Sequence, residues 1–219
     1  EFRRVLFRSK DLILKRLQQA REYLPKAKLR TNTNGDYISL NYIHKLRDAG
    51  LNELFIQQYL ANKQHYNHER MKKIMLLKIK KLGVDYSVIS DIPNHRIEYK
   101  LHIDGIVVHL RARNFDVEGT ARTKEVEESL KDYVRTQSCR QPFNNMYIDY
   151  NGSVVVCCNT RSDIPEHNDA MMGSIHHDKL WNIFTSNRYD SWRNHLKDDG
   201  PKEGICEKCK IDVDFGNFL

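Results

Sequence analysis

The sequence predicts an α/β protein made of an α/β part followed by a small α+β part that contains a β-hairpin. Predicted strands alternate with helices over roughly the first half of the 219 residues, which is typical of βαβ units. An Asn151-Gly152 pair lies between two β-prone runs further on. All five cysteines lie at or after Cys139, so any cysteine chemistry belongs to the second part.

Three amphipathic helices are predicted in the first part from apolar residues that recur at helical spacing. They cover Asp11–Leu24, Leu40–Ala49 and Asn67–Leu82. Pro25 ends the first helix, Gly50 caps the second and Gly83 ends the third. Helices of this length between strands predict crossover connections within one sheet.

Five strands are predicted around these helices: Lys28–Thr33, Asn52–Gln58, Val84–Ile89, Arg96–Ile103 and Ile106–Asn114. Asp104-Gly105 forms a turn between the last two. The alternation with helices predicts a parallel sheet. Because the units are too few for a closed eight-stranded barrel, the sheet would keep an exposed edge, and truncation explains this most simply.

The second part is organised around its cysteines. A hairpin predicted over Met146–Cys157, with a two-residue type I′ turn at Asn-Gly, presents Cys157. Cys139 precedes Pro142 in an irregular loop, and Cys206-Glu-Lys-Cys209 completes the set. Four thiolates delivered in this way suit one tetrahedral or cubane metal centre.

The fifth cysteine, Cys158, is interpreted as a packed thiol. Neighbouring residues on a strand point to opposite faces, so Cys157 and Cys158 would not both face one metal. A zinc site with four cysteines remains open, because spacing alone does not separate zinc from iron–sulfur. A disulfide is disfavoured, since no signal peptide is visible and the cysteines are unevenly spaced.

Composition indicates a soluble globular protein, with 40% hydrophobic and 30% charged residues. No apolar run approaches the roughly 20 residues of a membrane helix. The net charge is +7, yet residues 139–219 carry more acidic than basic side chains. Much of the basic excess lies on one predicted helix, at Lys72, Lys73, Lys78, Lys80 and Lys81. We interpret it as a solvated helix face, and nucleic acid is not an expected partner.

Several stretches of the second part recur together in one known family. They are Cys139-Arg-Gln-Pro142, Met146 to Gly152, Val154 to Cys158, Met172-Gly173-Ser-Ile175, Leu180-Trp181-Asn-Ile183, Arg193 and Cys206-Glu-Lys-Cys209. From Cys139 to about Val213 the chain resembles the SPASM/twitch extension of radical SAM enzymes. The turn at Thr33-Asn34-Gly35 is similar to the end of the third strand of the radical SAM partial barrel.

The resemblance implies one auxiliary [4Fe–4S] cluster held by Cys139, Cys157, Cys206 and Cys209, because the longer cysteine run of two-cluster relatives is absent. The family's catalytic cluster needs a Cys-x-x-x-Cys-x-x-Cys motif, and this sequence has no cysteine before Cys139. We interpret the chain as truncated at its N-terminus, with a degenerate homologue as the alternative. Residues 1–9 resemble the translation of a sequencing adapter and are treated as a non-native leader.

The implied domains are a partial radical SAM (β/α) barrel fragment at 10–120, a connecting helix at 121–138 and a SPASM/twitch domain at 139–219. In such barrels the site lies at the carboxyl ends of the strands. Six polar residues follow predicted strands there: Thr33, Asn34, Gln57, Gln58, Arg113 and Asn114. They are candidates for binding S-adenosylmethionine, and the alternative is that they only finish turns.

The intact protein is then expected to be an oxidoreductase or modifying enzyme that cleaves S-adenosylmethionine reductively and takes a hydrogen atom from its substrate. This implies S-adenosylmethionine, a second [4Fe–4S] cluster, a small-molecule or peptide substrate and a reductant such as flavodoxin or ferredoxin. The chain as written is expected to be inactive, and its catalytic residues are unknown. Oxygen-sensitive clusters favour the cytoplasm. The alternatives are a non-catalytic four-cysteine zinc module and an iron–sulfur electron-transfer module.

Overall fold

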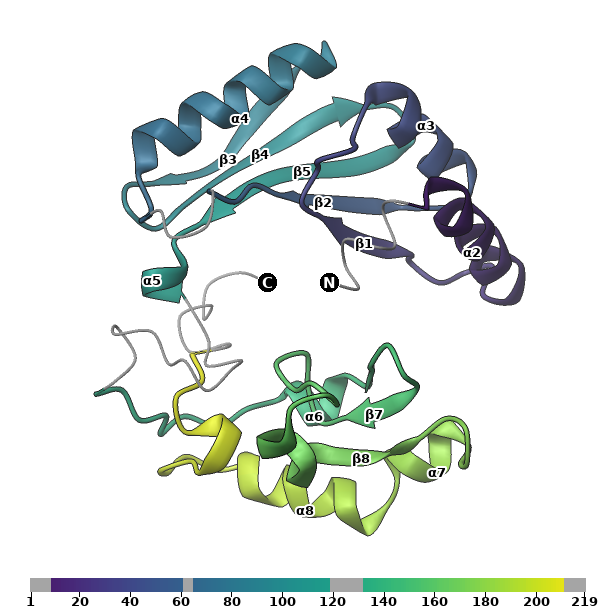
Figure 1. Ribbon diagram of the computed structural model, residues 1–219, viewed down its shortest axis with the longest axis vertical. Coiled ribbons are helices and arrows are strands. Elements are labelled where there is room, and N and C mark those ends of the chain that lie inside the picture. The colour runs from purple at the N-terminus through teal and green to yellow at the C-terminus, as the bar shows by residue number, and fades with distance from the viewer. Residues whose placement is uncertain (1–8, 61–64, 119–131, 211–219) are drawn as a thin grey trace. The chain divides into compact units, whose positions relative to one another are not determined.

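The computed structural model describes residues 9–60, 65–118 and 132–210 (Figure 1). The chain divides into two compact units, 1–114 and 115–219, and each is described by itself. Of the predicted leader at 1–9, residues 1–8 lie outside the described residues. None of the described helices is long and apolar enough to cross a membrane.

The N-terminal unit contains a five-stranded sheet of order β1-β2-β5-β4-β3. The strands are β1 (Arg30–Thr33), β2 (Glu53–Gln57), β3 (Tyr86–Ile92), β4 (Arg96–Ile103) and β5 (Ile106–Arg113). Strands β1, β2 and β5 are parallel, whereas β3, β4 and β5 form an antiparallel meander. This mixed sheet and its helices confirm the α/β fold class.

The predicted parallel sheet is therefore right for three strands and wrong for two. The reason is the turn at Asp104-Gly105, where Gly105 has φ +74° and Ile103 pairs directly with Ile106. Two residues join antiparallel strands only, because a parallel pair needs a crossover of about a dozen residues or more. The third strand also begins later than predicted, at Tyr86, and runs on to Ile92.

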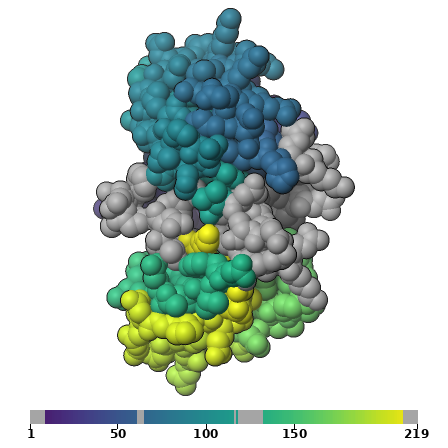
Figure 2. Space-filling view, turned by 90° about the vertical axis from the view of Figure 1, so that its left-hand side faces the viewer, coloured from purple at the N-terminus to yellow at the C-terminus, as the bar shows by residue number. Residues whose placement is uncertain are grey.

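Three helices pack against one face of this sheet: α2 (Lys10–Tyr23), α3 (Leu40–Asp48) and α4 (His68–Leu82). The side chain of Ser39 accepts a hydrogen bond from Tyr42 N and caps α3, and Asn67 caps α4 in the same way through Arg70 N. In Figure 2 the blue and teal surface of this unit is formed largely by α4 and the β3–β5 meander. The helices bury the apolar face of the strands.

Strand β5 shows how the two faces of the sheet differ. Val108, Leu110 and Ala112 are fully buried, and they alternate with His109 and Arg111, which are half-buried. Because alternate residues of a strand point to opposite faces, the face away from the core carries polar side chains.

The C-terminal unit contains a three-stranded antiparallel sheet of order β6-β7-β8. Its elements are α5 (Phe115–Glu118), α6 (Gln141–Asn144), β6 (Tyr147–Ile148), β7 (Ser153–Val155), η2 (Pro165–Ala170), β8 (Met171–Ser174), α7 (Leu180–Phe184), α8 (Asn187–Leu196) and η3 (Gly204–Cys206). Val154, Met172, Ile183 and Tyr189 form the centre of its core. This core fixes the strand β7 that leads to Cys157.

The predicted hairpin is present, but its turn is longer than expected. Asp149 N donates to Ser153 O over 2.8 Å and Gly152 N donates to Asp149 O over 3.0 Å, so three residues form the loop. Only Gly152 takes a positive φ, at +81°, whereas a type I′ turn would also need one at Asn151. Glycine closes a type I turn here.

The prediction of a connecting helix at 121–138 is wrong for the part of that range that the structure describes. Residues 121–131 lie outside the described residues, and residues 132–138 contain no helix. Arg135 N instead donates to Glu207 O over 2.7 Å, and Arg135 O accepts from Lys202 N over 2.9 Å. The backbone of this segment is engaged by the C-terminal loop, so it is not free to make helical hydrogen bonds. Figure 2 shows teal-green and yellow surfaces of this unit next to each other.

Candidate metal centre

Four of the five cysteine thiols line one pocket of the C-terminal unit. They belong to Cys139, Cys157, Cys206 and Cys209. Three of them are at most 8% exposed, and Cys157 is half-buried. The remaining lining residues are Arg135, Gln141, Pro142, Val156 and Leu196. Residues far apart in the sequence therefore bring four thiols to one enclosed place.

Local backbone hydrogen bonds hold each cysteine in position. Cys139 N donates to Leu196 O over 2.8 Å, which anchors the first cysteine to the end of α8. Thr160 N donates to Cys157 O over 3.1 Å and closes a turn directly after β7. Cys209 N donates to Cys206 O over 3.3 Å, so the Cys-x-x-Cys segment forms a tight turn.

Cys158 does not line this pocket. The alternation argument for choosing Cys157 over Cys158 is nevertheless wrong, because β7 ends at Val155 and both cysteines lie in the bend and turn that follow. Cys158 lies within the turn that the Thr160 N–Cys157 O hydrogen bond closes. All five cysteines are free thiols in this structure.

The pocket strongly disfavours ionised thiols when no metal is bound. Burial raises the pKa of Cys157 to about 11 and that of Cys206 to about 12. Both thiols are then neutral at pH 7 in the metal-free protein. Because a metal binds the thiolate, loading this site releases protons.

Three polar groups of the described residues approach the thiol sulfurs. Asn159 Nδ2 lies 3.6 Å from Cys209 Sγ, and Thr160 Oγ1 lies 3.6 Å from Cys157 Sγ. Arg135 Nη1 lies 4.0 Å from Cys209 Sγ. Groups of this kind around thiolate ligands stabilise the bound metal and tune its potential.

The chemistry of the thiols bears on what the pocket would hold. Among the described residues, no three His, Cys, Asp or Glu side chains are arranged as a ready site for one metal ion. All four cysteines nevertheless line one pocket. Four thiolates are the donor set of a [4Fe–4S] cluster and also of a tetrahedral zinc site, so the residues fit either group.

Two of the candidate ligand-binding residues in the N-terminal unit finish a turn. Thr33 is buried, and its Oγ1 accepts a hydrogen bond from Gly35 N over 3.1 Å. Asn34 Nδ2 donates to Asp36 Oδ2 over 2.6 Å, and Asn34 Oδ1 accepts from Asp36 N over 3.4 Å. Thr33 also pairs with the core residue Ile56, which places it on the apolar face of the sheet.

The other four candidates are the last residues of β2 and β5, Gln57 and Arg113, and the residues that follow them, Gln58 and Asn114. Gln57 and Arg113 belong to the polar face by strand alternation, and Gln57 Oε1 accepts from Arg111 Nε over 3.1 Å. Gln58 Nε2 donates to Tyr59 O over 2.9 Å. Asn114 Nδ2 donates to Asn94 O over 2.7 Å and ties down the β3–β4 turn. The structure thus gathers only Gln57 and Arg113 on one face.

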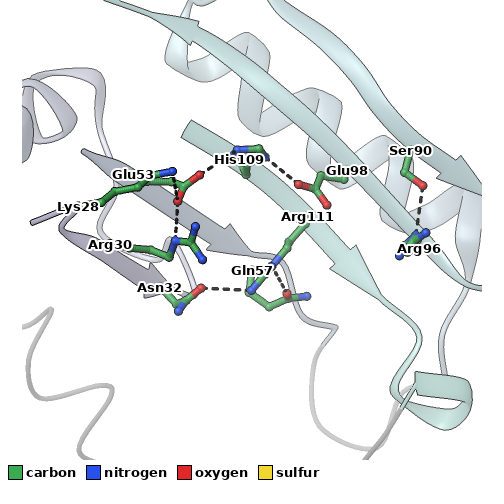
Figure 3. Close-up of polar contacts among 10 residues, drawn as sticks. All are labelled: Lys28, Arg30, Asn32, Glu53, Gln57, Ser90, Arg96, Glu98, His109 and Arg111. Carbon is green, nitrogen blue, oxygen red and sulfur yellow. Dashed lines mark hydrogen bonds and ion pairs between the residues drawn. The ribbon is translucent and has the colours of Figure 1, made fainter. Parts of the chain in front are cut away.

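The sequence reasoning missed a polar network on that same face (Figure 3). His109 Nδ1 lies 2.7 Å from Glu98 Oε1, and His109 Nε2 lies 3.7 Å from Glu53 Oε1. Glu53 also binds Lys28 over 3.3 Å and forms an ion pair with Arg30. The apolar–polar alternation of β5 is the signal that would have found this face.

The charges of this network perturb one another. Hydrogen bonding from His109 holds the pKa of Glu98 below its usual value. Burial alone would raise the pKa of Glu53, but the bonds from Arg30 and Lys28 hold it below its usual value. Both carboxylates are ionised at neutral pH. Arg111 is oriented by Gln57 and by Asn32 Oδ1 at 3.2 Å, and its guanidinium lies 4.5 Å from the centre of the Phe55 ring.

Residues 139–210 match the family model of SPASM, described as an iron-sulfur cluster-binding domain. This part of the chain is SPASM-like. The match begins at the first cysteine of the pocket and ends just after the last, so it contains all four thiols. It confirms the resemblance inferred from the cysteine pattern. No curated protein sequence matches the chain.

Two solved structures of BtrN, a radical SAM enzyme, share the fold. Selenomethionine BtrN in an open conformation has a TM-score of 0.52 and 16% identity, covering 88% of this chain and 61% of BtrN. BtrN in complex with AdoMet and 2-DOIA has a TM-score of 0.51 and 17% identity, covering 88% of this chain and 64% of BtrN. The chain therefore spans less than two thirds of BtrN, and the likeness shows a sheet-and-helix fold followed by a small domain.

Proposed function

We propose that the C-terminal unit holds one [4Fe–4S] cluster through Cys139, Cys157, Cys206 and Cys209, and that the chain is part of a radical SAM enzyme. The observation that carries this proposal is the single buried pocket lined by all four thiols inside the SPASM-like region. The fold shared with BtrN supports the enzyme class.

A four-cysteine zinc site is the second candidate, because thiolates bind both metals well. The match of residues 139–210 to an iron-sulfur cluster-binding domain favours the cluster. An electron-transfer module is the third, and it shares the cluster but not the S-adenosylmethionine chemistry. The zinc candidate is therefore distinguished by metal content, and the third by ligand binding.

The polar face of the N-terminal sheet is our proposed site for S-adenosylmethionine and the substrate. Arg111 is held by Gln57 and Asn32, and a guanidinium positioned in this way suits the carboxylate of an amino-acid group. Arg113, further along the same face of β5, adds a second guanidinium. The turn contacts of Thr33, Asn34 and Asn114 argue against a direct role for those side chains.

In the enzyme as proposed, a catalytic iron–sulfur cluster supplies the electron that cleaves S-adenosylmethionine, and its Cys-x-x-x-Cys-x-x-Cys motif is not in this sequence. This chain would contribute the sheet face that orients ligands and the thiol pocket for the auxiliary cluster. The substrate is a small molecule or a peptide, and flavodoxin or ferredoxin is the proposed reductant.

Anaerobic reconstitution of the full chain with iron and sulfide tests the cluster. We expect about four irons and four sulfides per chain and a brown protein, as thiolate-ligated [4Fe–4S] sites give. Offering zinc and iron with sulfide in parallel provides the comparison. A colourless protein that takes up one zinc ion and no sulfide would replace the cluster by a zinc site.

Saturation-transfer NMR with millimolar S-adenosylmethionine tests the N-terminal face. We expect S-adenosylmethionine to contact the chain and its affinity to fall about tenfold in Arg111→Gln. A tenfold loss corresponds to a charge-assisted hydrogen bond of roughly 1.5 kcal/mol. Arg47→Gln, on the surface of α3, is the matched control. Equal signals from both variants would remove Arg111 from the site.

A further inference from the structure

A buried arginine forms part of the wall of the cysteine pocket. Arg135 is 1% exposed, which makes it one of the largest fully buried side chains of the chain. Among the described residues that line the pocket, it is the only lysine, arginine, aspartate or glutamate. Complete burial of a guanidinium is costly, so its surroundings must compensate for the lost water.

Backbone carbonyls provide much of that compensation. Arg135 Nε donates to Gln137 O over 2.8 Å, and Nη2 donates to Ser138 O over 2.6 Å. Nη1 donates to Cys209 O over 3.3 Å. The guanidinium therefore holds the backbone just before Cys139 and the backbone of Cys209 at the same time.

The backbone of Arg135 joins the same two segments. Its N–H donates to Glu207 O and its carbonyl accepts from Lys202 N, over 2.7 and 2.9 Å. Two of the four thiols, those of Cys206 and Cys209, lie on this C-terminal loop, and Cys139 follows Arg135 closely. One residue thus fixes the distance between ligands that are far apart in the sequence.

The guanidinium also places a permanent positive charge beside the thiols. Nη1 lies 4.0 Å from Cys209 Sγ. Arginine stays protonated in proteins, whereas four thiolates around a [4Fe–4S]²⁺ core give a net charge of −2 and one-electron reduction makes it −3. A buried cation stabilises the more negative state more strongly, because the interaction grows with the charge it faces.

We propose that Arg135 is a positioning and electrostatic residue of the cluster site, which aligns the ligand segments and raises the reduction potential of the bound cluster. This inference rests on the proposed function, because it requires a cluster in the pocket. In this proposal the Arg135 guanidinium, whose Nη1 lies 4.0 Å from Cys209 Sγ, acts on the charge of the thiolate-ligated cluster. The competing explanation is a purely structural role, in which the hydrogen bonds to carbonyls hold the segments together and the charge does not affect the reduction potential.

Redox titration of the reconstituted full chain, followed by electron paramagnetic resonance of the reduced cluster, separates these explanations. In Arg135→Gln we expect the equilibrium constant for one-electron reduction to fall by about tenfold, which is about 59 mV for a one-electron couple. Arg135→Lys retains the positive charge but lacks the planar guanidinium. Its equilibrium constant for reduction is expected to stay within about threefold of the native value.

The matched control is Arg188→Gln in the same unit. Arg188 also donates to backbone carbonyls, those of Asn168 and Asp169, each over 3.3 Å, but it does not line the pocket. Its removal is expected to leave the potential unchanged. Iron content and the far-ultraviolet circular dichroism of each variant are measured alongside.

A lower potential in Arg135→Gln with a retained value in Arg135→Lys supports the proposal, as does a cluster lost from the first variant and kept by the second. A native potential in Arg135→Gln overturns it, and so does loss of the cluster from both variants. Failure of the unmodified chain to bind four irons would refute the proposed function itself, which is a separate result.

Discussion

The turn that ends β1 gives the sharpest test of the fold, through Gly35→Ala compared with Gly83→Ala. Both glycines adopt left-handed backbone, with φ +74° and +68°. A Cβ at Gly35 would lie 2.6 Å from Ile56 Cγ2, whereas a Cβ at Gly83 would meet nothing within 4 Å. Ile56 is fully buried between strands and cannot move aside.

The two substitutions share one cost and differ in another. Left-handed backbone costs a non-glycine residue about 1–2 kcal/mol in both variants. The gain from a stiffer unfolded chain, about 0.4–1 kcal/mol, is also common to both. Overpacking against Ile56 adds about 1–3 kcal/mol to Gly35→Ala alone. We therefore expect Gly35→Ala to be less stable than Gly83→Ala by about 1–3 kcal/mol.

Urea unfolding measures this difference, with amide hydrogen exchange at Leu54 and Ile56 assigning the transition to the N-terminal unit. With a slope of about 2 kcal/mol per molar urea, the midpoint of Gly35→Ala should lie roughly 0.5–1.5 M below that of Gly83→Ala. Equal midpoints would refute the inference that this turn packs closely against β2.

Two further predictions concern the thiol pocket and the polar network. Cys157→Ala should abolish reconstitution of the cluster while Cys158→Ala retains about four irons per chain, and the reverse pattern would exchange their roles. Glu98 has a folded-state pKa below its usual value, chiefly because His109 hydrogen-bonds to it. A depressed carboxylate pKa contributes stability above the unfolded value that is lost as pH falls through the folded value, so Glu98→Gln should lose less stability than the native chain on acidification below about pH 4.3. Identical acid-unfolding profiles would contradict a stabilising role for that hydrogen bond.

The cysteine pattern was predictable because its information is local and its members are chemically distinctive. A Cys-x-x-Cys turn and a hairpin around Asn151-Gly152 each follow from a few neighbouring residues. The detailed turn was not predictable in the same way. Whether Gly152 closes a two- or three-residue loop depends on how β6 and β7 pair, which adjacent residues alone do not determine.

The N-terminal unit shows a different limit. Helix positions and strand positions follow from periodicity, but strand direction depends on which strands become neighbours. The short Asp104-Gly105 turn indicates an antiparallel pair, whereas the alternation of strands with helices indicates a parallel sheet, and the prediction followed the alternation. The polar network was missed because contacts such as Gln57 with Arg111 arise from the register of β2 against β5, which links residues far apart in the sequence.

Mössbauer spectroscopy of the full chain reconstituted with ⁵⁷Fe and sulfide tests the central claim most directly. We predict a diamagnetic spectrum of one [4Fe–4S]²⁺ cluster that accounts for about four irons per chain. The spectrum should be lost when Cys139 and Cys209 are replaced by alanine. Mononuclear iron–thiolate signals, or a cluster that survives the double substitution, would contradict the assignment of these four thiols to one iron–sulfur site.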